Sequence, residues 1–225
     1  MYYGMNRQVS IFTIPGTTTL NVDCTLDQLN RMIDKMDRRL YLYGSILTAD
    51  DEDINMVGSS MVADIIEKIM EFNRADKNDD IDPEQRTPIR LYINSPGGDV
   101  TEGFALIDVI EASKTPVYTI NVGEWSSMSF LIGIAGKKRF SLKHATFLLH
   151  DGSSFVGGST GKVQDKILFD SRFEEEAIKP HVLAHGNMSS EEYDSHRRDE
   201  FYMLPEDAMK YNFIDEIVDD IDAVL

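Results

Sequence analysis

The chain has 225 residues, 42% of them hydrophobic, which is enough for one sizeable core, so a single domain over residues 1–225 is expected. The net charge of −17 argues against a general nucleic-acid-binding protein, which needs a basic face. A lone cysteine, Cys24, excludes an intrachain disulfide. No apolar run reaches the roughly 18 residues of a membrane span, so we expect a cytoplasmic protein with no membrane contact.

The first third of the chain predicts short elements around a helix and a strand. Short apolar segments around Pro15-Gly16 predict a hairpin or extended arm over residues 1–23. Apolar residues at helical spacing predict helices over 25–38 and 56–72, with a strand over 38–46 between them. Residues 73–88 are so polar that a surface loop is expected there.

The central stretch, residues 91–131, has the pattern from which the function is inferred. An apolar strand breaks at Pro96-Gly97-Gly98 and is followed by an amphipathic helix, a second strand over 117–122 and serines at the start of an apolar helix. A Gly-Gly turn can aim bare backbone N–H groups at a ligand, and a helix N-terminus favours developing negative charge. Turns that follow successive parallel strands lie at one sheet edge, so this stretch predicts chemistry on a carbonyl group.

The rest of the chain continues the alternation of strands and helices. Two strands, 139–142 and 145–150, follow a turn at Lys137–Arg139, and His150 ends the second strand. A glycine-rich segment, 152–161, precedes a long helix over 163–186, and Ser189 begins another helix with a capping-box pattern. Because strands and helices alternate, the fold class is α/β with largely parallel pairing.

Several of these motifs resemble the proteolytic subunit of the Clp protease, the ClpP family. They are LYINSPGGDV, WSSMS before an apolar helix, KKRF, LLHDG and RRDEFYMLPEDAMKYNFID, in the family's order over about Arg38 to Val218. The resemblance implies a ClpP/crotonase-like superfold of stacked, largely parallel β-sheet and helices. It also implies a core over 38–218, a divergent N-terminal arm over 1–37 and a protruding helix-strand handle over about 152–186.

The resemblance also assigns the site. It makes Ser127 the nucleophile, His150 the general base and acid, and Asp199 the carboxylate that orients the imidazole. The backbone N–H groups of Gly98 and Met128 would form the oxyanion hole. Arg198, beside Asp199, matches a residue that links the catalytic group to contacts between rings in the family.

Other residues compete for these roles. From the residues alone, Ser126 and Ser127 are nearly equal candidates for the nucleophile, and two further aspartates and two lysines are alternatives for the other roles: Asp151, Asp194, Lys137 and Lys138. His144 and His196 lie in polar contexts. His181 and His185 have the i, i+4 spacing of a helical metal site, but no third ligand is evident from the sequence, so neither a metal nor another cofactor is expected.

The expected activity is that of a serine endopeptidase acting on short or unfolded polypeptides inside stacked heptameric rings, a homo-oligomer of 14 subunits, fed by an AAA+ unfoldase. Two alternatives are a catalytically quiet ring subunit and an acyl-CoA enzyme of the crotonase type. The chain also departs from the family pattern: Trp125 near the nucleophile is expected to narrow the S1 pocket, and Asp151-Gly152 and the acidic segment 75–86 are unusual. These differences indicate a divergent member.

Overall fold

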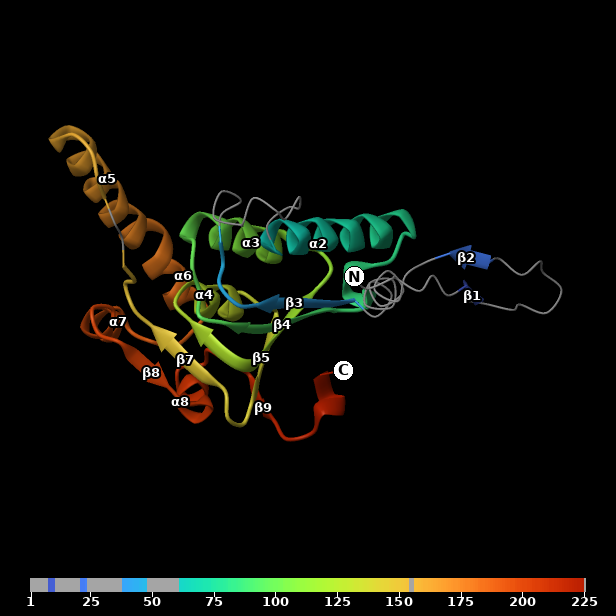
Figure 1. Ribbon diagram of the computed structural model, residues 1–225. Helices are drawn as coiled ribbons and strands as arrows, with labels where there is room; N and C mark the ends of the chain where they lie inside the picture. Colours follow the sequence, from blue (N-terminus) through green and yellow to red (C-terminus); the bar gives the residue numbers. More distant parts are fainter. Residues whose placement is uncertain (1–7, 11–20, 24–37, 48–60, 154–155, 225) are drawn as a thin grey trace, which may run out of the picture. The chain divides into compact units, whose positions relative to one another are not determined.

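The structure is a computed structural model that describes residues 8–10, 21–23, 38–47, 61–153 and 156–224 (Figure 1). It divides into two units, Met1–Arg39 and Leu40–Leu225. In the first unit, β1 (Gln8–Ser10) pairs antiparallel with β2 (Asn21–Asp23), in agreement with the hairpin predicted over 1–23. The helix predicted over 25–38 lies outside the described residues apart from Arg38.

The second unit is built on a seven-stranded sheet with the order β3-β4-β5-β6-β9, in which β7 lies beside β5 and β8 beside β7. All but one of the pairings recorded from β4 onward are parallel, and the exception is the antiparallel pair β7/β8. The predicted α/β class with largely parallel pairing is therefore confirmed. The strands are β3 (Arg39–Tyr43), β4 (Ile89–Ser95), β5 (Val117–Ser126), β6 (Lys138–Leu142), β7 (Thr146–Leu149), β8 (Phe201–Met203) and β9 (Glu216–Val218).

Strand β5 is longer than the sequence predicted because it pairs with two neighbours in succession. Its first half pairs with β6, from Tyr118 opposite Lys138 onward. Its second half pairs with β7, ending with Ser126 opposite Leu148. The prediction placed the end of this strand at residue 122, but the ladder with β7 extends it to Ser126. This extension brings the end of β5 beside the end of β7.

Three helices pack against one another beside the sheet: α2 (Met61–Asn78), α3 (Val100–Ala112) and α4 (Met128–Ile134). Figure 1 shows α2 and α3 side by side along one face of the sheet. The surface loop predicted over 73–88 is wrong in its first part, since residues 73–78 continue α2. Asp76 is only 1% exposed, and its carboxylate accepts a hydrogen bond of 2.7 Å from the Thr115 hydroxyl. That bond compensates for burying a charged residue in the helix.

The long helix predicted over 163–186 is present but interrupted. It consists of α5 (Thr160–Phe173), a π-helical turn over Glu174–Ile178 and α6 (Lys179–Ala184). In Figure 1, α5 extends away from the sheet, and its large apolar residues Ile167, Leu168 and Phe169 are all exposed. The preceding glycine-rich segment forms no strand in its described residues, 152–153 and 156–159.

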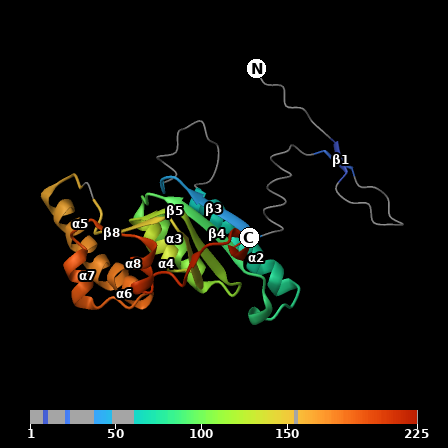
Figure 2. The ribbon, with the colours of Figure 1, turned by 90° about the horizontal axis from the view of Figure 1, so that it is seen from below.

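The C-terminal part returns to the sheet through α7 (Ser190–His196) and α8 (Pro205–Lys210). Seen from below in Figure 2, α5 to α8 gather at one end of the sheet. The capping box predicted at Ser189 is confirmed: its hydroxyl accepts from the backbone of Glu192, whose carboxylate accepts from the backbone of Ser189. Short 3-10 turns lie at Pro83–Gln85 and Ile221–Val224. None of the described helices is long and apolar enough to cross a membrane.

Candidate active site

Ser127 forms the junction between β5 and α4. Its backbone has a φ of 56° and a ψ of −124°, and Ser127 is one of four non-glycine residues with a positive φ in the described part of the chain. Residues in such regions cost about 1–3 kcal/mol, so the surrounding structure must hold them in place. Here the Ser127 N–H donates to the Leu148 carbonyl at 3.0 Å, and its own carbonyl accepts from Phe130 at 3.0 Å. A serine on a strained strand-to-helix turn is the geometry of a nucleophile elbow.

The two neighbouring serines have structural hydrogen bonds instead. The Ser126 hydroxyl donates to the Glu124 carboxylate at 2.6 Å, and Ser126 is only 4% exposed. The hydroxyl of Ser129, which is fully buried, donates to the Ser95 carbonyl at 2.6 Å and accepts from the Ser126 N–H at 2.9 Å. Within the described part of the chain, the Ser127 hydroxyl makes no hydrogen bond, so it is the one free to react.

The glycine turn after β4 lies directly against this junction. A Cβ atom added at Gly97 would lie 2.8 Å from the Ser127 Cβ and 2.9 Å from the Met128 nitrogen, so only glycine fits. Gly98 has a φ of 145°, and a Cβ there would approach the Ile46 carbonyl oxygen to 2.0 Å. Among the described residues, the N–H groups of Gly98 and Met128 have no acceptor. The turn after β4 is thus packed against the Ser127 junction, and the assignment of Gly98 and Met128 to an oxyanion hole stays a prediction.

His150 lies at the same edge of the sheet, immediately after β7. Because β7 runs parallel to the end of β5, both strands deliver their following residue to one place. The His150 Nδ1 atom is 2.9 Å from the Glu200 Oε1 atom. Its Nε2 atom is buried and has no partner in the described chain. With Nδ1 donating to the carboxylate, Nε2 carries the lone pair that a general base needs.

The carboxylate beside His150 is that of Glu200, and the structure does not bring Asp199 there. The register of β7 and β8 explains this, because Leu149 pairs with Phe201, which places Glu200 opposite His150. Asp199 is exposed, its N–H donates to the His196 carbonyl at 2.9 Å, and its carboxylate has no hydrogen bond in the described chain.

The alternative carboxylates are occupied or turned away. Asp194 forms hydrogen bonds of 2.8 Å with the Lys179 ammonium, and Asp151 is exposed. Arg198, expected in ring contacts, is exposed and has no ion pair in the part of this chain that is described. The neighbouring Arg197 instead forms an ion pair of 2.9 Å with Glu175, at the base of the α5–α6 segment.

Trp125 does not reach the site. Its side chain is fully buried, lies edge-on to Phe147 with ring centroids 5.5 Å apart, and leaves no room for a Cβ at Gly133 of α4. The ring therefore fills the core beneath the elbow, and the expectation that it narrows the S1 pocket is not supported. Trp125 lies only two residues before Ser127 in sequence, yet its side chain packs into the core.

The two lysines considered as bases lie far along the sheet from Ser127. Lys138 begins β6 opposite Tyr118, at the start of β5, whereas Ser127 follows the end of β5. The Lys138 ammonium lies 5.6 Å from the centre of the Tyr118 ring. Since the two ends of one strand lie at opposite edges of the sheet, a Ser-Lys arrangement has no support.

Fold and site together define an α/β protein with a serine at a nucleophile elbow. The family model for Clp protease matches residues 54–220. Over 143 residues the chain is 33% identical to the ATP-dependent Clp protease proteolytic subunit 1 of Streptomyces avermitilis. This alignment covers 63% of this chain and 65% of that protein. Over 145 residues it is 34% identical to the corresponding subunit of Deinococcus radiodurans, covering 63% and 69%.

The chain belongs to the Clp protease family, which confirms the family resemblance and the fold expected with it. The aligned part spans about two thirds of the length of these relatives, 65% in the first and 69% in the second.

Proposed function

We propose that this chain is a serine peptidase subunit in which Ser127 attacks the carbonyl carbon of a peptide bond. The observation that supports it most is the free hydroxyl of Ser127 on a positive-φ turn, beside two backbone N–H groups without acceptors. The hydroxyl is too weak an acid to ionise alone, so His150 Nε2 takes its proton during attack. The oxygen that becomes negative then accepts from Gly98 and Met128.

Each later step uses the same groups. The protonated His150 returns the proton to the leaving amine, which leaves an acyl group on Ser127, and a water molecule attacks this ester with His150 again as the base. Removing one oxyanion donor of this kind costs about 10²–10³ in rate. The role of orienting carboxylate goes to Glu200, because its contact with Nδ1 fixes the tautomer of His150 that the mechanism requires.

The proposed substrates are short or unfolded polypeptides, processed in stacked heptameric rings of identical chains with an AAA+ unfoldase as partner. The exposed apolar residues of α5, Ile167, Leu168 and Phe169, support assembly because contiguous apolar surface is usually covered by a partner. The relatives described as ATP-dependent proteolytic subunits are consistent with a partner ATPase. A cytoplasmic location stays a prediction.

A reactive-serine assay tests the nucleophile. We expect a fluorophosphonate probe to label the assembled protein, with labelling lost in Ser127→Ala and kept in Ser126→Ala. A matched peptidase assay with a fluorogenic peptide should follow the same order. Labelling that persists in Ser127→Ala and disappears in Ser126→Ala would overturn the assignment.

A second candidate function, a ring subunit that is inactive by itself, is favoured by one observation. The Ser127 hydroxyl and the His150 Nε2 atom both lack a hydrogen bond in the described chain, so they are not bonded to each other. If this separation persists in rings, assembled protein of confirmed ring mass stays unlabelled. If assembly closes the gap, labelling appears only in the ring fraction of a size-exclusion column.

A further inference from the structure

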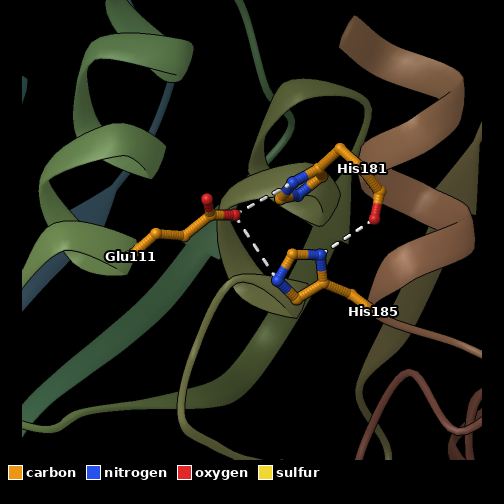
Figure 3. Close-up of side chains that lie close together, drawn as sticks. All are labelled: Glu111, His181 and His185. Carbon is orange, nitrogen blue, oxygen red and sulfur yellow. Dashed lines mark hydrogen bonds and ion pairs between the residues drawn. The ribbon is translucent and has the colours of Figure 1, made fainter.

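Two histidines and a glutamate from separate elements converge at the base of the α5–α6 segment, away from Ser127. Glu111 comes from the last turn of α3, His181 from α6, and His185 from the C-cap position of α6. Their ligand atoms all lie within 4.8 Å of one another. Figure 3 shows the Glu111 carboxylate directed at both rings from one side, in contact with each. The third ligand that the sequence did not reveal is therefore Glu111.

Backbone contacts fix the orientation of both imidazole rings. The Nε2 atom of His181 is 2.9 Å from the Leu131 carbonyl oxygen of α4, and Nδ1 of His185 is 2.8 Å from the His181 carbonyl oxygen. Since a carbonyl only accepts, each of these nitrogens carries the hydrogen. The remaining nitrogens, His181 Nδ1 and His185 Nε2, present lone pairs toward Glu111. A backbone carbonyl on the far nitrogen is the usual support of a metal-bound histidine.

The distances fit a metal ion better than hydrogen bonds. The Glu111 Oε1 atom is 3.3 Å from His181 Nδ1 and 3.4 Å from His185 Nε2, beyond the usual range of an N–H···O bond. Zinc holds such ligands at about 2.0–2.1 Å, so two ligands of a tetrahedral site lie about 3.3–3.4 Å apart. The two glutamate–histidine separations match this spacing, and all three ligand atoms lie within 4.8 Å of one another.

Burial makes a simple ion pair a poor explanation. His181 is only 8% exposed, and its Nε2–H already donates to the Leu131 carbonyl. Its Nδ1 atom therefore directs a lone pair at the negative Glu111 oxygen, and the two repel unless a cation separates them. The nearest arginine adds no free charge, since Arg139 is paired with Asp215 at 2.7 Å while donating to the His185 carbonyl.

An ion has a path to this position. His185 lines an open surface pocket together with residues from the α4–β6 turn and from the loop after α8. The side chains of His185 and Glu111 are 23% and 43% exposed, whereas that of His181 is 7% exposed. An ion entering from solvent would therefore meet two partly exposed ligands before the buried one.

We propose that Glu111, His181 and His185 bind one divalent transition-metal ion of the zinc type, with water in the fourth position. The ion would join the end of α3 to α6 and, through the second nitrogen of His181, to the Leu131 carbonyl of α4. Its role is structural, to fix the base of the α5–α6 segment against the helices that begin at the candidate active site.

A titration with metal alone tests the site without reference to peptidase activity. The full chain, freed of any purification tag and stripped with a chelator, is titrated with Zn²⁺ against a chromophoric competitor. We expect one ion per chain, and a loss of affinity of at least tenfold in Glu111→Gln and in His185→Gln. Co²⁺ should give the intense visible absorption of a four-coordinate site in the wild type and lose it in both variants.

Two matched variants serve as controls. Asp108→Asn removes an exposed carboxylate from the same helix, and His144→Gln removes an exposed histidine from another turn, so neither should change binding. Circular dichroism and the thermal unfolding midpoint show whether each variant is folded. Absence of zinc binding in the folded wild type overturns the proposal, as does equal binding in the wild type, Glu111→Gln and His185→Gln.

Discussion

The backbone conformation of Ser127 predicts that glycine at this position gives a more stable protein than alanine, the reverse of the order in a helix. Ser127→Gly and Ser127→Ala both lack the hydroxyl, so the two variants differ only in the Cβ atom at a φ of 56° and a ψ of −124°. A residue with a Cβ costs about 1–3 kcal/mol in such a region, whereas glycine loses about 0.5–1 kcal/mol more backbone entropy on folding. The mid-range values of these two costs differ by about 1 kcal/mol, so we expect the glycine variant to be more stable than the alanine variant by about that amount.

Thermal unfolding at fixed protein concentration measures this difference. In a chain of this size each kcal/mol shifts the midpoint by about 2–4 °C, so a rise of a few degrees for Ser127→Gly over Ser127→Ala is expected. Both variants should have lost peptidase activity and fluorophosphonate labelling. A glycine variant that is more stable than the alanine variant is the result expected of a strained turn.

A control position with ordinary helical backbone geometry should show the opposite order of stability between its glycine and alanine variants. Ser195 is exposed and lies in α7, where glycine should be less stable than alanine by about 1 kcal/mol. If Ser127→Gly is no more stable than Ser127→Ala while Ser195 behaves as stated, the strain assigned to the elbow does not exist.

Three further predictions follow from individual contacts. Glu200→Gln should lower kcat of peptide hydrolysis by about 10²–10⁴ with a smaller change in KM, and Asp199→Asn should have little effect; the reverse order would return the orienting role to Asp199. Trp125→Ala should cost about 3–5 kcal/mol in urea unfolding, because the buried ring leaves a cavity, and a cost below about 1 kcal/mol would contradict its burial. Although partial burial alone would raise the pKa of Asp215, hydrogen bonds from Arg139 outweigh it and lower that pKa. The stability that Asp215 adds is thus present above the ordinary aspartate pKa and lost as pH falls below about 4. The free energies of unfolding of wild type and Asp215→Asn should therefore converge in acid, and a difference between them that persists there would refute this.

The parts of the site that the sequence predicted depend on local patterns. A Gly-Gly turn after an apolar strand and a serine before an apolar helix indicate backbone donors and a nucleophile, whatever the rest of the fold. The spacing of Phe104, Ile107 and Ile110 likewise placed α3 correctly, with Ile107 and Ile110 buried and Phe104 packed against the core. These features need only the conformational freedom of glycine and the periodicity of a helix.

The parts that the sequence did not predict depend on contacts between distant elements. The choice between Asp199 and Glu200 is decided by the pairing of β7 with β8, in which a shift of one residue exchanges the two side chains. Asp76 appeared too polar for the core because its hydrogen-bond partner, Thr115, is distant in sequence. Thr115 lies in the short connection between α3 and β5. The burial of Trp125 likewise depends on contacts with other elements, namely Phe147 of β7 and Gly133 of α4.

The candidate active site and the histidine cluster share two helices, which limits how variants of the cluster can be interpreted. Helix α3 starts just after Gly98, is capped by Asp99 and carries Glu111 in its last turn. Helix α4 starts after Ser127 and offers its Leu131 carbonyl to His181. A loss of peptidase activity in a His181 variant would therefore follow from displacement of either helix start, without any catalytic role for the histidine. For this reason the metal titration of Glu111→Gln and His185→Gln, rather than their hydrolysis rate, decides what the cluster binds.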